Sequence, residues 1–164
     1  MIQAVIVTVS DSAVAGTRAD RSGPALRERV EALGWTVCGQ ELVADERDQI
    51  ASVLTRWSST TETRVIFTTG GTGVALRDIT PEATRDVIDR EVPGLGELMR
   101  AEGRKNTPFA ALSRGLAGLR GHSLIVNLPG SPKGAVESLD SIAKLIPHIV
   151  DLLEGRTSHS SVSR

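Results

Sequence analysis

The fold of this chain is decided by residues 65–73, which read Val-Ile-Phe-Thr-Thr-Gly-Gly-Thr-Gly. The apolar residues 65–67 predict a buried β-strand, which runs directly into a loop of three threonines and three glycines. The glycines let the backbone turn tightly and bring its N–H groups close to a ligand, and the threonine hydroxyls add short donors. The loop therefore predicts a nest for an oxyanion, most simply a phosphate, with a tight turn that binds nothing as the alternative. The residues of this loop are Thr68, Thr69, Gly70, Gly71, Thr72 and Gly73.

Strands and helices are predicted to alternate on both sides of this loop. Apolar, β-branched runs predict further strands over 4–9, 35–43 and 123–128. Residues 10–21 read as a loop, and residues 103–121 carry no clear assignment. Helices are expected to begin at the caps Ser22, Asp45 and Thr80 and near Pro93, and a last helix is expected over 133–154 with a kink at Pro147.

This alternation with short connections predicts an α/β fold, a three-layer α/β/α sandwich with a mostly parallel central sheet. The 164 residues suffice for one buried core, and we expect a single domain over 1–155. The Ser- and Thr-rich residues 156–164 are expected to form a disordered tail. Because ligands of such sheets bind beyond the carboxyl ends of the strands, the loops after these strands are the first candidates for a site.

The composition excludes several classes of protein. Aromatic residues make up 2% of the chain and the formal net charge is −1, so neither a stacking surface nor a basic patch for nucleic acid is expected. Cys38 is the single cysteine, which excludes an internal disulfide and every metal site built from several cysteines. With no membrane-length apolar run and no signal-like N-terminus, the chain is expected to be soluble and cytoplasmic.

Two carboxylates are predicted to lie near the glycine loop. Asp78 follows the loop, and Asp45 follows the second strand on the same predicted rim, with Glu46 and Asp48 as alternatives. A carboxylate beside a phosphate site is readily explained by Mg²⁺, which binds one or two carboxylates together with substrate phosphates. The simpler explanation for each aspartate is a cap of the helix that follows it.

Other polar residues on the same rim are candidate contacts to an anion. Ser10 and Asp11 end the first strand, and Ser22 and Gly23 begin a helix whose N-terminus attracts anions or is simply capped. Ser113 and Arg114 form a candidate phosphate clamp. Residues 127–133 form a rigid turn, in which Asn127, Pro129, Gly130, Ser131 and Lys133 are the candidate ligand contacts.

Taken in order along the chain, these motifs resemble the MoaB/MogA-type molybdopterin-binding family. The resemblance extends from Ala4 to about Glu154 and is most specific from Thr68 through Thr84. The segments that carry it are 8–12, 20–23, 68–73, 77–84, 91–94, 113–114 and 127–133.

The resemblance implies an ATP- and Mg²⁺-dependent nucleotidyltransferase of molybdenum-cofactor synthesis. In catalytic members of the family, the terminal phosphate of molybdopterin attacks the α-phosphate of ATP, adenylyl-molybdopterin forms and pyrophosphate leaves. By this resemblance, Asp45 and Asp78 are the two acidic residues that position Mg²⁺–ATP. The other candidates named above are then substrate-binding residues.

The resemblance also implies a homo-oligomer, a trimer or a hexamer, and a metal-insertion protein that uses the activated product. Some members bind the pterin without adenylylating it, and a non-catalytic carrier of the same pathway is the second hypothesis. A phosphate-binding or scaffold protein that does not bind the pterin is the third.

Overall fold

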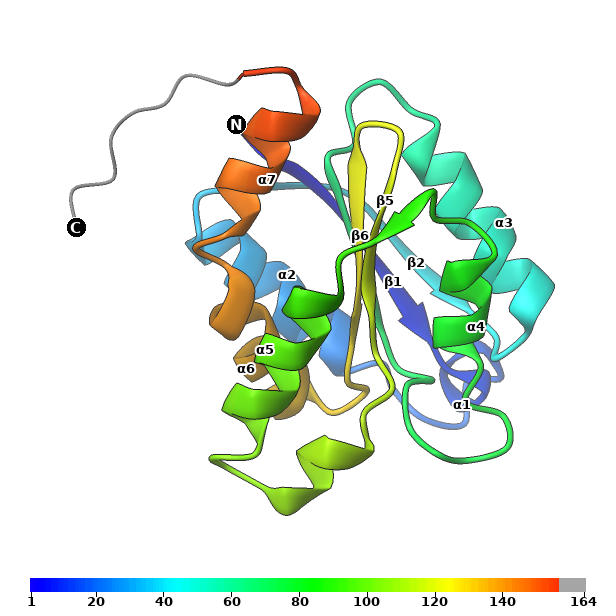
Figure 1. The fold of residues 1–164 in the computed structure, drawn as a ribbon. Coiled ribbons are helices and arrows are strands. Elements are labelled where there is room, and N and C mark those ends of the chain that lie inside the picture. The colour runs from blue at the N-terminus through cyan, green and yellow to red at the C-terminus, as the bar shows by residue number, and fades with distance from the viewer. Residues whose placement is uncertain (157–164) are drawn as a thin grey trace.

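Four parallel strands and two antiparallel strands form a six-stranded sheet in the computed structural model, which describes residues 1–156. The strand order is β2-β1-β3-β6-β5-β4 (Figure 1). The parallel strands are β1 (Gln3–Val9), β2 (Thr36–Val43), β3 (Val65–Thr69) and β6 (Ser123–Leu128), and the antiparallel strands at one edge are β5 (Ala117–Arg120) and β4 (Arg90–Glu91).

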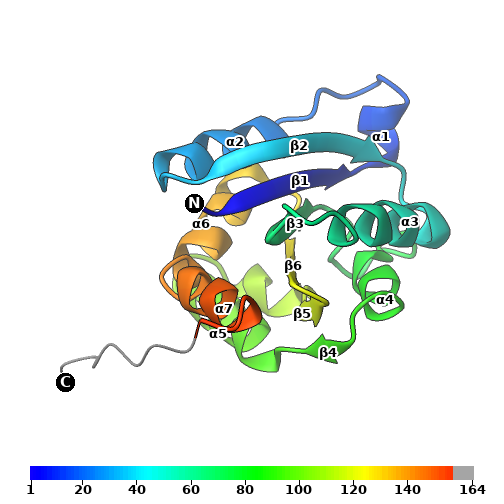
Figure 2. The ribbon, with the colours of Figure 1, turned by 90° about the horizontal axis from the view of Figure 1, so that it is seen from above.

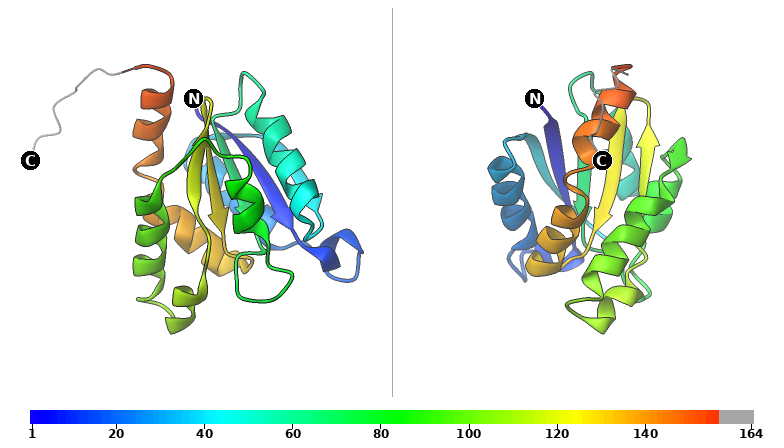
Figure 3. Two further views of the ribbon diagram at one scale, coloured as in Figure 1. Left: turned by 45° about the vertical axis from the view of Figure 1, so that its right-hand side comes forward. Right: turned by 60° about the vertical axis from the view of Figure 1, so that its left-hand side comes forward.

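Helices cover both faces of this sheet, which gives three layers (Figures 2 and 3). One face packs against α2 (Ser22–Ala32), α5 (Pro93–Gly103), α6 (Pro132–Ile142) and α7 (Ile146–Leu153). The other face packs against α3 (Arg47–Ser58) and α4 (Thr80–Arg85). The predicted α/β/α sandwich with a mostly parallel sheet is therefore confirmed.

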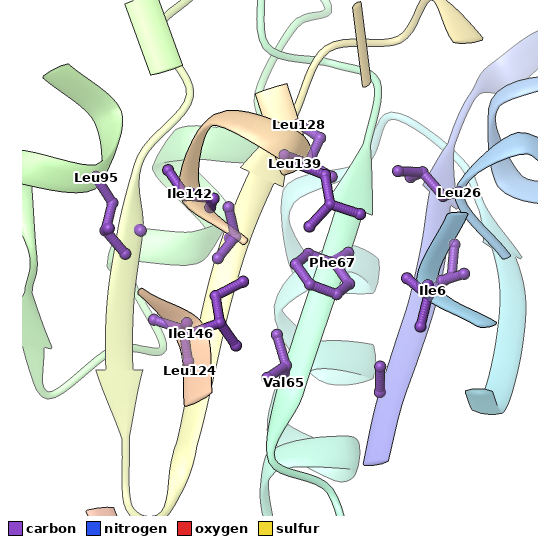
Figure 4. Close-up of a cluster of buried hydrophobic side chains, with 14 of the residues drawn as sticks. Ile6, Leu26, Val65, Phe67, Leu95, Leu124, Leu128, Leu139, Ile142 and Ile146 are labelled. Atoms are coloured by element: carbon purple, nitrogen blue, oxygen red, sulfur yellow. The ribbon is translucent and has the colours of Figure 1, made fainter. Parts of the chain in front are cut away.

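The burial of β1 explains why its sequence is continuously apolar. Ala4 and Ile6 belong to the core on the α2 side, whereas Val5, Val7 and Val9 belong to the core on the α3 side. Successive side chains of a strand point to opposite faces, so a strand covered on both faces needs apolar residues at every position. Figure 4 shows the larger of the two cores, in which Ile6 lies beside Phe67 of β3.

Four short elements were absent from the sequence prediction. A short helix, α1 (Asp11–Val14), interrupts the predicted loop, and β4 and β5 lie in segments without an assigned strand. The unassigned segment also contains a 3₁₀ helix, η1 (Pro108–Leu112). These elements are two to five residues long and are too short to leave a periodic pattern.

The predicted long C-terminal helix is two helices. The chain leaves α6 after Ile142 and begins α7 at Ile146, with Pro147 in the first turn of α7. Because a proline ring clashes with the carbonyl four residues earlier, at Ala143, Pro147 breaks the helix instead of kinking it. The predicted tail lies outside the described residues, apart from Arg156, which pairs with Asp151. No helix within residues 1–156 is long and apolar enough to cross a membrane.

The two phenylalanines of the chain allow a matched test of the core. Phe67 is fully buried in β3 and stacks on Trp35 with ring centroids 6.5 Å apart, whereas Phe109 is 74% exposed. We expect Phe67→Ala to lower the free energy of unfolding by about 3–5 kcal/mol. Phe109→Ala should lower it by less than about 1 kcal/mol. Urea denaturation of both variants measures the difference, and equal losses would contradict this description of the core.

Candidate active site

Two cavities lie beyond the carboxyl ends of the parallel strands and share one wall. The first has a volume of about 420 Å³ and extends toward α5 and η1. The second has a volume of about 470 Å³ and extends toward α1 and the start of α2. Both are lined by Gly71 and Asp78 of the loop after β3, and by Gly130 and Ser131 of the loop after β6.

The glycine loop has the backbone conformation that its sequence predicts. Gly70 and Gly71 have φ angles of +103° and +65°, which side-chain-bearing residues rarely adopt. The carbonyl oxygens of both glycines accept hydrogen bonds from Thr80, at 2.9 Å from its hydroxyl and at 3.0 Å from its N–H. Among the described residues, no group accepts a hydrogen bond from the N–H groups of residues 71–73. Three successive amides are thus available to an oxyanion. Gly71 lines both cavities, and Thr72 and Gly73 line the first.

The threonines of the loop differ from the prediction. Thr68 is buried, lines neither cavity and accepts a hydrogen bond from Asn127. Thr69 donates its hydroxyl hydrogen to the Pro129 carbonyl at 2.7 Å, although it lies at the wall of the second cavity. Thr72 lines the first cavity. The expectation of three hydroxyl donors was therefore wrong for Thr68 and Thr69, because strand β3 continues through both residues.

Asp45 faces the site and does not cap a helix. Helix α3 begins at Arg47 with Glu46 as its N-cap residue. One Asp45 carboxylate oxygen accepts a hydrogen bond from the Asp11 N–H at 2.9 Å, and the Asp45 N–H donates to the Asp11 carboxylate at 3.0 Å. The other oxygen lies 3.0 Å from where a Cβ atom on Gly71 would stand. The Asp45 carboxylate is thereby held against the glycine loop.

Asp78 does not cap a helix either, since the N-cap residue of α4 is Ile79. Its carboxylate accepts a hydrogen bond from the Ala75 N–H at 3.0 Å, and its side chain lines both cavities. One Asp78 carboxylate oxygen lies 2.8 Å from where a Cβ atom on Gly73 would stand. The structure therefore brings both aspartates to the glycine loop, Asp45 at Gly71 and Asp78 at Gly73.

The electrostatics of Asp45 reflect this proximity. Burial raises the pKa of the Asp45 carboxyl, and the negative charges of Asp11 and Asp78 raise it further against the opposing hydrogen bond from Asp11 and the charge of Arg77. Within residues 1–156 there is no cluster of three or more Asp, Glu, His or Cys side chains that could hold a metal ion alone. Two carboxylates are nevertheless a sufficient protein contribution for Mg²⁺, provided that a bound phosphate supplies further oxygen ligands.

Arg77 neutralises the other acidic groups around Asp45. It donates to the Asp11 carboxylate at 2.6 Å and to the Glu46 carboxylate at 2.9 Å. The Arg77 hydrogen bond, followed by the backbone hydrogen bond from Asp45, lowers the pKa of the Asp11 carboxyl. Asp11 lines neither cavity and holds the backbone of Asp45. Of the three acidic candidates after β2, Asp45 is the one that lines a cavity.

Of the predicted ligand contacts near the N-terminus, some line the second cavity and others do not. Ser10 and Ser22 line the second cavity, but the N–H of Gly23 already donates to the Asp20 carboxylate at 3.0 Å. The N-cap residue of α2 is Arg21, and the Asp20 carboxylate, not the Ser22 side chain, accepts the hydrogen bond from its first turn. Arg18 and Arg21 also line the second cavity and were missed, because arginines in a polar loop are usually solvated.

Two predicted ligand contacts, Asn127 and Lys133, interact with other residues of the protein. The buried Asn127 amide donates to the hydroxyls of Thr68 at 3.0 Å and Thr84 at 2.9 Å, and accepts from the Leu116 N–H at 3.3 Å. It reaches the first cavity with these polar atoms already engaged. Lys133 lines neither cavity; its side chain is 83% exposed, and its ammonium nitrogen lies 3.8 Å from the Glu137 carboxylate.

Arg114 also lines neither cavity, and its guanidinium binds protein carbonyls and a carboxylate. The phosphate clamp predicted for it was therefore wrong, whereas its neighbour Ser113 lines the first cavity. Pro129, Gly130 and Ser131 lie where predicted, at the wall of that cavity. Residues of α5 and η1, such as Met99 and Leu112, complete the wall. Leu112 was missed because the segment that contains η1 had no assigned element, and Met99 because apolar helix residues are usually core residues.

Comparison with known proteins gives a consistent set of relatives. A family model described as "Probable molybdopterin binding domain" matches residues 5–148. The molybdopterin adenylyltransferase of Helicobacter pylori (strain J99 / ATCC 700824) is 45% identical over 152 residues, which cover 92% of this chain and 86% of that protein. The crystal structure of the molybdopterin biosynthesis enzyme MoaB from Thermus thermophilus has a TM-score of 0.89 and 51% identity, covering 94% of this chain and 98% of that one.

A longer relative contains a similar segment. The molybdenum cofactor synthesis protein cinnamon of Drosophila melanogaster is 45% identical over 149 residues, which are 90% of this chain but only 25% of that protein. The chain thus spans about a quarter of the length of this relative.

A pair of glycine variants tests the oxyanion nest. A Cβ atom on Gly71 would lie 2.4 Å from the Thr80 hydroxyl, whereas Gly34 has a similarly positive φ of +80° and nothing within 4 Å. We expect both Gly71→Ala and Gly34→Ala to lose roughly 1–2 kcal/mol of stability from backbone strain. Only Gly71→Ala should weaken the binding of pyrophosphate, by about tenfold or more, in isothermal titration calorimetry. Unchanged affinity in a folded Gly71→Ala protein would refute the placement of the nest.

The raised pKa of Asp45 predicts a pH-dependent gain of stability in Asp45→Asn. At pH 7 the ionised Asp45 is less favourable in the folded than in the unfolded chain, so the ligand-free variant should melt at a higher temperature than the wild type. The difference should vanish as the pH falls below 3.8, where the wild-type carboxyl is protonated in both states. Thermal melts at several pH values, with Asp48→Asn as control, measure this. A lower melting temperature of Asp45→Asn at pH 7 would contradict the electrostatic argument.

Proposed function

Because the chain belongs to the family of probable molybdopterin binding domains, we propose that it is a molybdopterin adenylyltransferase. The terminal phosphate of molybdopterin attacks the α-phosphorus of ATP, a new P–O–P linkage forms, and the bond from the α-phosphorus to pyrophosphate breaks. The products are adenylyl-molybdopterin and pyrophosphate, so the chain is a nucleotidyltransferase that binds two small phosphorylated substrates.

The observation that carries this proposal is the pair of cavities that meet at the glycine loop. A reaction between two phosphorylated substrates needs two compartments, and the reacting phosphates must lie where the compartments meet. Gly71 and Gly130 stand at that junction with Asp78. A non-catalytic carrier of the same ligand would have no use for the second compartment.

The residues of the chain align the two anions and neutralise their charge. The amides of residues 71–73 are available to a phosphate, and helix α6 begins at the same junction with Ser131 as its N-cap residue. Amides and a helix N-terminus stabilise negative charge that develops during the reaction without reorganising. The reaction therefore needs no protein nucleophile, and holding the two phosphates in line supplies much of the rate enhancement.

We further propose that Asp45 and Asp78 hold the Mg²⁺ of Mg²⁺–ATP. Their carboxylates lie against the glycine loop, that of Asp45 at Gly71 and that of Asp78 at Gly73. Burial, and then the repulsion from neighbouring carboxylates that include Asp78, raises the pKa of Asp45. A shared divalent cation would relieve this repulsion, and its preference for hard oxygen ligands matches the two carboxylates. When bound, Mg²⁺ supplies charge neutralisation for the leaving pyrophosphate.

The family resemblance also supports proposals on the domain, the assembly, the location and the downstream partner of the chain. We propose one molybdopterin-binding domain over 1–155, a trimeric or hexameric assembly, a cytoplasmic location, and transfer of the product to a molybdenum-insertion protein. Partners are small molecules, and neither nucleic acid nor a membrane is needed for the reaction.

The decisive test is pyrophosphate release from Mg²⁺–ATP in the presence of molybdopterin. We expect release by the wild type and by Asp48→Asn, whose side chain is exposed in the first turn of α3. Asp78→Asn should release pyrophosphate at least about 100-fold more slowly, because a positioned charge at the reacting phosphates is lost. If the wild type binds molybdopterin and releases no pyrophosphate, the chain is a carrier and the adenylyltransferase proposal fails. If it binds no molybdopterin, the phosphate-binding scaffold hypothesis holds instead.

A further inference from the structure

The loop that carries Asp78 has an apolar anchor at its end, where the partly buried Ile79 packs against the core on the α3 side. It connects β3 to α4, and two of its apolar side chains point into solvent, with Val74 67% exposed and Leu76 fully exposed. Burial of apolar side chains is what usually fixes a loop of this length. Between the glycines and Ile79 the loop is therefore held by polar contacts, which are the ion pairs of Arg77 with Asp11 and Glu46 and hydrogen bonds to the loop backbone.

Arg114 makes these contacts at both ends of the loop. The backbone N–H of Arg114 donates to the Thr72 carbonyl at 2.8 Å, and its side-chain Nε donates to the Gly73 carbonyl at 2.7 Å. Its Nη2 donates to the carbonyl of Asp78 itself at 2.6 Å. One side chain thus joins the beginning of the loop to its end, although Arg114 lies 36 residues from Asp78 in the sequence.

The Glu82 carboxylate binds the remaining guanidinium nitrogen of Arg114, Nη1. The Nη1 of Arg114 donates to the Glu82 carboxylate, which belongs to the first turn of α4. Burial would raise the pKa of the Glu82 carboxyl, but the hydrogen bond and the charge of Arg114 bring that pKa below its usual value. Within the described chain, the second oxygen of Glu82 is buried without a hydrogen-bond partner. The carboxylate is therefore committed to Arg114, and it fixes the guanidinium relative to α4.

From these contacts we infer that Arg114 and Glu82 form a positioning clamp for Asp78, and that this clamp determines how tightly the site holds Mg²⁺–ATP. The inference rests on the proposed function. Arg114 is not itself a catalytic residue, because its guanidinium donates to protein groups and lines neither cavity. It acts through the backbone of the residue whose carboxylate faces the substrate.

The clamp requires the guanidinium fork and not simply a positive charge. Three groups in different directions, the two carbonyls and the Glu82 carboxylate, are bound by one planar cation. A lysine ammonium at position 114 is a compact point charge on a flexible stem and cannot reproduce this geometry. Arg114→Lys is therefore expected to behave like Arg114→Gln.

The experiment compares Arg114→Gln and Arg114→Lys with the matched control Arg47→Gln. Arg47 also makes a two-armed pair with a carboxylate, Asp86, at 2.6 and 2.8 Å, but it lines neither cavity. Steady-state pyrophosphate release gives kcat and the half-saturating concentration of Mg²⁺–ATP, and calorimetry gives the affinity for molybdopterin. Hydrogen–deuterium exchange reports the protection of the amides of residues 73–78.

We expect both Arg114 variants to raise the half-saturating Mg²⁺–ATP concentration by roughly 10- to 100-fold, the usual cost of losing an outer-shell partner. Their affinity for molybdopterin should change by less than about twofold, and exchange in 73–78 should accelerate. Arg47→Gln should change none of these quantities. Glu82→Gln, which keeps a hydrogen-bond acceptor for Arg114, should give a smaller increase and replaces the Arg114 variants if they do not fold.

Three outcomes would overturn the clamp. The first is a wild-type half-saturating concentration in Arg114→Gln, the second is an equal effect in Arg47→Gln, and the third is full recovery in Arg114→Lys. If the wild type itself releases no pyrophosphate, the adenylyltransferase proposal fails. The exchange data then decide on the clamp alone, and unchanged protection of residues 73–78 in Arg114→Gln would refute it.

Discussion

The site depends on how closely three loops approach one another at the carboxyl edge of the sheet. A Cβ atom on Gly70 would lie 2.3 Å from the Val9 carbonyl, and one on Gly130 would lie 3.2 Å from the Cα of Gly70. No side chain fits at either position without displacing backbone. The absence of side chains lets the loops after β1, β3 and β6 converge, and both cavities open at the point of convergence. A substitution at these glycines would therefore affect the junction of the cavities before it affected the sheet.

Around this junction, arginines pair with neighbouring carboxylates, whereas Asp45 and Asp78 have no such pair in the described part of the chain. Arg77 pairs with Asp11 and Glu46, and Arg114 pairs with Glu82. Asp45 and Asp78 line a cavity and have no ion pair among the described residues. The surrounding arginines thus fix the loops and leave the two aspartates free to share a cation. An arrangement that maximised the stability of the empty protein would have paired these aspartates as well.

The sequence was sufficient for the parts of the fold that short-range patterns control. The apolar run before the glycine loop, the strand over 123–128 and the conformation of Gly70 and Gly71 follow from neighbouring residues. Side-chain partners were predicted poorly because they depend on the three-dimensional path of the chain. Arg114 binds Gly73 from 41 positions away, and the amide of Asn127 binds Thr68 from 59 positions away. Nothing in the local sequence separates an arginine that clamps a loop from one that binds phosphate.

The simplest alternative for the two aspartates was that each caps a helix, and the structure decides against it. An N-cap side chain stabilises a helix by accepting a hydrogen bond from its first turn, but the N-cap residues of α3 and α4 are Glu46 and Ile79, and neither makes such a bond. Asp45 instead stands in a position where burial and neighbouring charges raise its pKa. Its one hydrogen bond, from the Asp11 N–H, leaves the charge without an ion pair among the described residues, and a ligand best explains such a carboxylate at the glycine loop. That ligand must bring positive charge and must fit between two aspartates and a row of free amides, and a metal–phosphate complex has both properties.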